Sequence, residues 1–71
     1  MSISYKKLWK LLIDKDMTKT QLREKADIAT STLAKLSKDE QVSMDVLLRI
    51  CKTLDCDISD IIELTKESKN V

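Results

Sequence analysis

The chain contains neither glycine nor proline among its 71 residues. These two residues make most hairpins and tight turns, so their absence argues against a β-rich fold. The length allows only one domain around one small core. Together, these two constraints favour a small helical protein whose helices are joined by short polar connections.

Five stretches of the chain carry apolar residues at the spacing of one helix face. The clearest begin at Tyr5 and Leu47, where apolar residues recur at i, i+3, i+4 and i+7. The stripes predict an all-α, compact five-helix bundle over residues 1–66, followed by a frayed tail at 67–71. The expected helices cover about residues 5–15, 18–26, 30–37, 44–54 and 58–62, with inward-facing Tyr5, Leu8, Trp9, Leu12, Leu22, Ala26, Ile28, Leu33, Leu36, Leu47, Ile50, Cys51, Leu54, Ile58, Ile61 and Ile62.

Polar residues in front of these stretches mark where the helices begin. Side-chain oxygens of Ser, Thr and Asp can accept hydrogen bonds from the free N–H groups of a first helical turn. Thr18 and Gln21 also have the spacing of a capping box, in which each side chain binds the backbone of the other residue. The expected N-caps are Ser4, Thr18, Ser43 and either Asp57 or Ser59.

Charge is distributed unevenly along the chain, although the net charge is only +1. Residues 1–38 hold nine basic and four acidic side chains, whereas residues 39–71 hold four basic and eight acidic ones. The first part therefore has a net charge of +5 and the second of −4. Such a chain can present a basic face to nucleic acid while it stays nearly neutral overall.

The apolar spacing between residues 19 and 38 predicts two helices packed at an angle. Leu22 and Ala26 would lie on the first helix and Leu33 and Leu36 on the second, with Ile28 in a connection of about three residues. Such a pair is a helix-turn-helix, here at about residues 18–37. In DNA-binding versions the second helix enters the major groove and the first crosses the backbone.

Two segments carry a resemblance to a known family: MTKTQLREKADIATSTLAKL at 17–36 and VSMDVLLRICKTLDCDISDII at 42–62. The chain resembles the Cro and phage-repressor type of helix-turn-helix regulator, the XRE family, in its short single-domain form. The likeness extends from about Ser4 to Leu64. It implies a bacterial or phage-borne, sequence-specific DNA-binding transcriptional regulator, repressor-like and commonly dimeric.

The helix expected at about residues 30–37 turns its leucines inward, so its polar side chains face away from the core. The resemblance implies that its first two exposed positions, and the one a turn later, reach base edges. Lysine can donate to guanine, and hydroxyl groups can bond several bases. The expected base-contacting residues are Thr30, Ser31 and Lys35; the expected phosphate-contacting residues are Lys19, Thr32 and Lys38; weaker candidates for the DNA backbone are Lys6, Lys10 and Arg23.

The chain departs from the family pattern at three positions. Asp27 stands in the turn where relatives usually carry glycine, and Asp tolerates φ > 0 better than most residues do. Arg23 stands where a small residue is common, so its stem must run along the surface with the charge in water. Ala29 is a poor N-cap, and Thr30 is expected to take that role.

Two other classes of function compete with DNA binding. A helix-turn-helix fold can serve as a protein-interaction module, such as an antitoxin-like or anti-repressor partner, and the acidic second part with apolar Ile61, Ile62 and Leu64 supports this alternative. An enzyme is the weakest reading, because the chain has no histidine and Cys51 and Cys56 have no evident base. We therefore expect no enzymatic activity, no cofactor, no metal and no small-molecule ligand.

The expected partners are double-stranded DNA, at an operator-like and palindromic site, and a second copy of the chain. A single small domain makes few base contacts, so pairing on two half-sites adds affinity. The last expected helix, with Ile61 and Ile62, is the candidate dimer interface. No apolar run approaches the ~20 residues that span a membrane, and both cysteines are expected to be reduced, so we expect a cytoplasmic protein.

Overall fold

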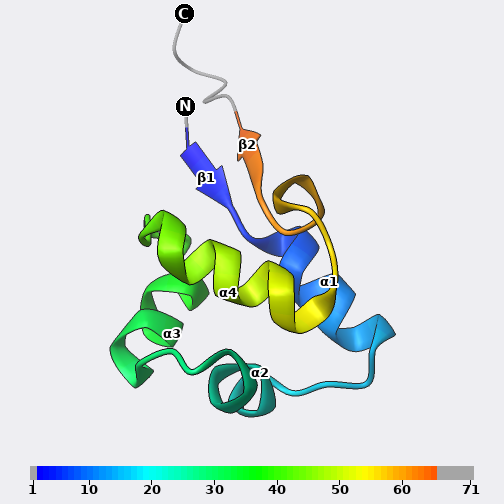
Figure 1. Ribbon diagram of the computed structural model, residues 1–71. Helices are drawn as coiled ribbons and strands as arrows, with labels where there is room; N and C mark the ends of the chain where they lie inside the picture. The colour runs from blue at the N-terminus through cyan, green and yellow to red at the C-terminus, as the bar shows by residue number, and fades with distance from the viewer. Residues whose placement is uncertain (1, 66–71) are drawn as a thin grey trace, which may run out of the picture.

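The computed structural model describes residues 2–65, and the tail expected at 67–71 lies outside these residues. Four helices form the body of the domain, and α2 and α3 make up the helix-turn-helix (Figure 1). The secondary-structure elements occur in this order along the chain: β1 (Ser2–Ser4), α1 (Lys6–Asp14), α2 (Lys19–Ala26), α3 (Thr30–Ser37), α4 (Met44–Leu54), the 3-10 turn η1 (Ile58–Asp60) and β2 (Glu63–Thr65).

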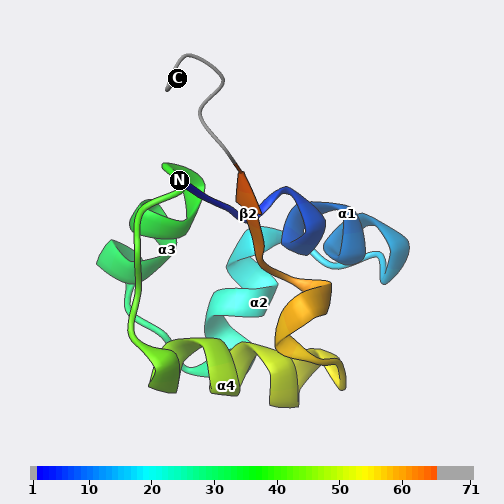
Figure 2. The ribbon, with the colours of Figure 1, turned by 90° about the horizontal axis from the view of Figure 1, so that it is seen from above.

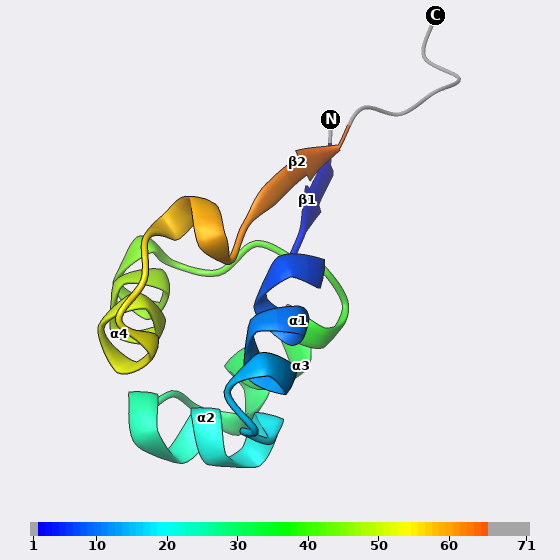
Figure 3. The same ribbon diagram turned by 90° about the vertical axis from the view of Figure 1, so that its right-hand side faces the viewer.

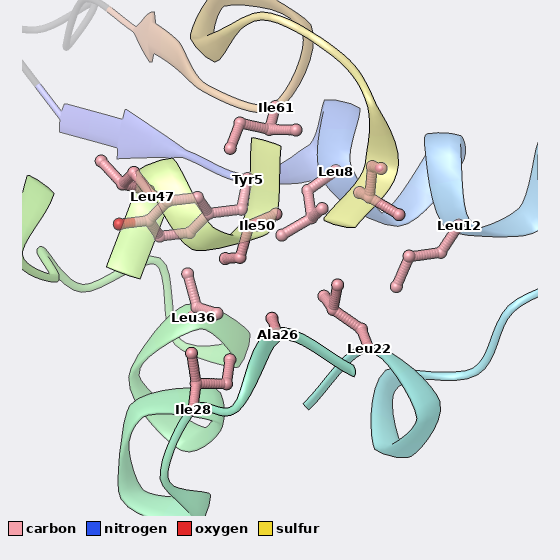
Figure 4. Packing of buried hydrophobic residues seen from close by; sticks show 11 residues of the cluster. Tyr5, Leu8, Leu12, Leu22, Ala26, Ile28, Leu36, Leu47, Ile50 and Ile61 are labelled. Carbon is pink, nitrogen blue, oxygen red and sulfur yellow. The ribbon is translucent and has the colours of Figure 1, made fainter. Parts of the chain in front are cut away.

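The core lies where the four helices and η1 converge, and α2 packs chiefly against α4. Figure 4 shows Tyr5, Leu8 and Ile50 meeting Leu36 and Ile61 in this interior. The stripes of the sequence therefore predicted the core. Its buried members are Tyr5, Leu8, Leu12, Leu22, Ala26, Ile28, Leu36, Leu47, Ile50, Leu54 and Ile61.

Tyr5 ties the start of α1 to the connection between α3 and α4. Its backbone N–H donates to Asp39 Oδ1 at 3.1 Å, and its hydroxyl donates to the Glu40 carbonyl at 2.7 Å. Burial raises the pKa of the Tyr5 hydroxyl, so the group stays protonated and remains a donor. The hydroxyl at the end of the buried Tyr5 side chain therefore has a hydrogen-bond partner.

Three of the expected N-caps, Thr18, Ser43 and Asp57, are confirmed, and two expectations are wrong. Thr18 and Gln21 form the complete capping box, and the Ser43 side chain accepts from the Val46 N–H at 3.3 Å. Tyr5, not Ser4, is the N-cap of α1. At α3 the N-cap is Ala29 without any side-chain hydrogen bond, so the backbone enters this helix without the cap expected from Thr30.

The expected fifth helix is wrong, because residues 58–60 make only a single 3-10 turn. Asp57 and Asp60 form a capping box across this turn, and Ile61, the residue that follows it, has a φ angle of −122°. The chain then returns as β2 and pairs antiparallel with β1, with Ile3 opposite Leu64. Figure 3 shows this ribbon projecting from the helices. Over residues 2–65 the domain is thus mostly helical, with four α-helices, and it also contains a small two-stranded sheet despite the lack of glycine.

Each of the four helices is followed by an aspartate in the left-handed region. The φ angles of these residues lie between 53° and 58°. In each case the next N–H donates to the carbonyl five residues back, which is the long bond of a Schellman motif; at Asp27 the bond joins the Ile28 N–H to the Arg23 carbonyl at 3.1 Å. Glycine usually fills this position, and here Asp does so throughout. The four residues are Asp16, Asp27, Asp39 and Asp55.

We predict that Asp16→Gly stabilises the domain by about 0.5–1 kcal/mol in urea unfolding. Glycine adopts φ > 0 freely, and the substitution removes a negative charge from the negative end of a helix dipole. Asp39→Gly is the matched comparison, since it also loses the carboxylate that accepts from the Tyr5 N–H. We expect it to gain nothing or to lose stability; equal gains in both variants would contradict this role of Asp39.

Candidate nucleic-acid interface

The outer face of α3 is polar, exposed and without a carboxylate. Ile28 and Leu36 are buried and Leu33 is half-buried, so these three side chains fix which face of the helix turns outward. No Asp or Glu occurs between residues 28 and 38. The structure brings four of the predicted contact residues together on or directly after this exposed face: Thr30, Ser31, Lys35 and Lys38.

Thr32 and Lys19 are placed differently from this group. Thr32 is half-buried on α3. Lys19 begins α2, and its Nζ lies 4.2 Å from the centre of the Trp9 ring and 3.4 Å from Ser37 Oγ. The ammonium group therefore joins α1, α2 and the last residue of α3. Trp9 is half-buried against the core, and the ammonium lies over its ring in a cation–π contact.

The weaker candidates are not gathered around α3. Lys6 is exposed on α1, and Lys10 lines a surface hollow with Asp55 and Asp60. Figure 2 shows α3 on one side of α2, with α1 and the turn at 58–60 on the other. Arg23 is half-buried on α2, with its guanidinium 3.9 Å from the adjacent Glu24 carboxylate. Its charge thus lies beside an exposed carboxylate of the same helix.

Arg49 of α4 contacts the turn of the helix-turn-helix, a role the sequence did not reveal. Its Nη1 donates to the Asp27 carbonyl at 2.8 Å, and its Nε lies 3.1 Å from Asp45 Oδ2. The i, i+4 spacing of Asp45 and Arg49 is a visible signal for the ion pair. The contact with Asp27 joins residues 22 apart in the chain, and no periodic pattern in the sequence predicts it.

The two thiols lie against each other at the end of α4. Cys51 and Cys56 are the positions that meet in the Schellman motif closed by Asp55, and the Cys56 N–H donates to the Cys51 carbonyl at 3.0 Å. Burial raises the pKa of both thiols, that of Cys56 to about 11. Little thiolate forms near neutral pH, so neither sulfur is an activated nucleophile. Within residues 2–65 no cluster of His, Cys, Asp or Glu is arranged to hold a metal ion.

The sequence profile of the Cro/C1-type helix-turn-helix DNA-binding domain matches residues 7–67. The match covers most of the chain, and the chain belongs to this family. It is also similar to a solved structure, that of the transcriptional regulator VanUg in crystal form II, with 57% sequence identity and a TM-score of 0.90. The similarity covers 93% of this chain and 88% of that one. A comparison with curated protein sequences gives no match.

None of the helices among residues 2–65 is long and apolar enough to cross a membrane. The longest of them, α4, has 11 residues and carries charged side chains on its outer face. A span of the hydrocarbon layer would need about 20 predominantly apolar residues.

We predict that Trp9 and Lys19 stabilise the fold cooperatively. In a double-mutant cycle with Trp9→Leu and Lys19→Met, the coupling free energy of unfolding should be about 0.5–1 kcal/mol, as for an exposed cation over an aromatic ring. Urea unfolding followed by circular dichroism measures it. Lys25→Met is the matched control on the same helix, and its cycle with Trp9→Leu should be additive. Additivity in both cycles would rule out the contact between Lys19 and Trp9.

Proposed function

We propose that the protein is a sequence-specific, double-stranded DNA-binding transcriptional regulator, repressor-like, which inserts α3 into the major groove. One observation carries this proposal: the face of α3 opposite Ile28 and Leu36 is exposed, holds hydroxyl and lysine side chains, and lacks carboxylates. A helix of this kind in a helix-turn-helix frame matches the groove in shape and charge. The family and the likeness to a transcriptional regulator support the same function.

The side chains of α3 divide into two groups by what they can reach. Thr30, Ser31 and Lys35 stand on the first two turns and are proposed to contact base edges. Lys38 follows the helix and is proposed to contact a phosphate, together with Thr32 at the helix flank. Phosphate contacts fix register and base contacts carry sequence preference, so the two groups are separable by experiment.

Lys19 is proposed to reach a phosphate from the first turn of α2. Its exposed ammonium lies beside Ser37 Oγ, at the last residue of α3. The free N–H groups of the same first turn favour an anion at this place. Lys6, Lys10 and Arg23 remain weaker candidates for the DNA backbone.

We predict that Lys35→Ala weakens binding to the preferred DNA site by about 1–3 kcal/mol and flattens the preference among bases at one position. Lys38→Ala should weaken preferred and unrelated DNA alike and lower the salt slope by about one. The preferred site comes from selection out of a random DNA pool, and fluorescence anisotropy gives the affinities. A chain that selects no sequence and shifts no DNA at low salt would disprove the proposed function.

A second copy of the chain is proposed to bind the other half of a palindromic site. The surface expected to pair the copies needs correction, because Ile61 is buried in the core and Ile62 is half-buried. Of the three apolar residues that favoured a protein-interaction module, Leu64 alone is exposed, so the apolar part of that argument is weaker. The large apolar side chains that stay exposed within residues 2–65 are Ile13, Met44, Leu48 and Leu64.

We predict two protein chains on one palindromic DNA fragment, with half-sites about 34–36 Å apart between centres. Sedimentation velocity of the complex measures this ratio. A fragment with a single half-site should bind one chain more weakly. One chain on the palindrome at saturating protein would contradict pairing, while specific binding by that one chain would leave the role of α3 intact.

A further inference from the structure

Few local contacts hold the start of α3 in place. Its N-cap is Ala29, which makes no side-chain hydrogen bond. The residue that turns the chain from α2 toward α3 is Asp27, at φ 56° and ψ 51°. This conformation is intrinsically unfavourable for a residue with a Cβ atom, so a contact from outside the turn adds stability to it beyond the Schellman bond.

Arg49 makes that contact from the opposite helix. Its Nη1 donates to the carbonyl of Asp27 at 2.8 Å, while Asp45 Oδ2 lies 3.1 Å from its Nε and orients the guanidinium plane. The carbonyl belongs to the peptide that leads into Ile28, so its direction follows from the ψ angle of Asp27. A fixed carbonyl therefore fixes the path by which the chain enters α3.

The guanidinium is also well placed electrostatically. The Asp27 carbonyl stands at the carboxyl end of α2, where the helix dipole is negative and a cation is favourable. Lys25 and Lys52 line a surface hollow together with Asp27 and Arg49. No hydrogen bond or ion pair of the Lys52 side chain occurs among the described residues. Nη1 of Arg49 thus binds the Asp27 turn, and Nε binds the Asp45 carboxylate that orients the guanidinium.

We propose that Arg49 is a positioning residue of the DNA-binding site: it holds the left-handed Asp27 turn and thereby sets the direction of α3. The proposal rests on DNA binding by α3 as proposed above. Arg49 acts through the backbone and makes no contact with DNA. Its loss loosens the groove-facing side chains and leaves the number of phosphate contacts unchanged.

The test compares Arg49→Met with Lys52→Met, which removes the same charge from the next turn of the same helix. Each variant is titrated with the selected DNA site at several salt concentrations. We expect Arg49→Met to weaken binding roughly fivefold relative to Lys52→Met, with the same salt slope, because one charge-assisted hydrogen bond is lost. A salt slope lower by about one would instead reveal a direct phosphate contact and overturn the proposal.

Asp27→Gly provides a second arm, because glycine adopts the turn conformation without help. The affinity loss caused by Arg49→Met should shrink in the Asp27→Gly background. An unchanged loss in that background would contradict action through the turn. Arg49→Lys keeps the charge but lacks the planar fork, so it should lose part of the affinity.

A measurement without DNA separates this proposal from the proposed function. The Ile28 N–H is held by the Arg23 carbonyl when the turn is closed. Its hydrogen exchange should be faster in Arg49→Met than in Lys52→Met, at matched global stability. Equal exchange would overturn the role of Arg49 even if the protein binds DNA, whereas faster exchange would support it even if no DNA site is found.

Discussion

The left-handed aspartate at the end of each helix is the constraint on which the rest of the structure depends. A chain without glycine must still reverse direction four times, and Asp16, Asp27, Asp39 and Asp55 do this with φ between 53° and 58°. The Schellman bonds compensate the local cost, because each satisfies a carbonyl that the helix end leaves free. Two of these turns recruit further partners: Asp39 binds the Tyr5 N–H, and the Asp27 carbonyl binds Arg49.

These added contacts connect the turns to the candidate interface. The α3 helix carries no side-chain cap and sends only Leu36 fully into the core. Arg49 holds the turn before it, and Lys19 reaches Ser37 at its last residue. The direction of the exposed Thr30, Ser31 and Lys35 side chains therefore depends on a few polar contacts at the two ends of the helix, as well as on Ile28 and Leu36 beneath it.

The sequence predicted the four helices, the core and the exposed face of α3, because each follows from apolar spacing within one element. It could not predict the 3-10 turn, in which Asp57 and Asp60 form a capping box across only three residues. It could not predict the strand pair either, because the pairing of Ile3 with Leu64 joins the two ends of the domain. The contact of Arg49 with Asp27 and those of Lys19 could not be predicted for the same reason. They join residues far apart in the chain through single side chains, and such contacts leave no periodic signal.

The most direct test of the central claim is to map the DNA-contacting surface by amide chemical shifts. The ¹⁵N-labelled protein is titrated with its selected DNA site. We predict that the largest changes fall on residues 30–38 and on the first turn of α2, with small changes in η1 and in the strand pair. The largest changes on the outer face of α4, around Met44 and Leu48, with α3 unaffected, would contradict the claim that α3 is the surface that reads DNA.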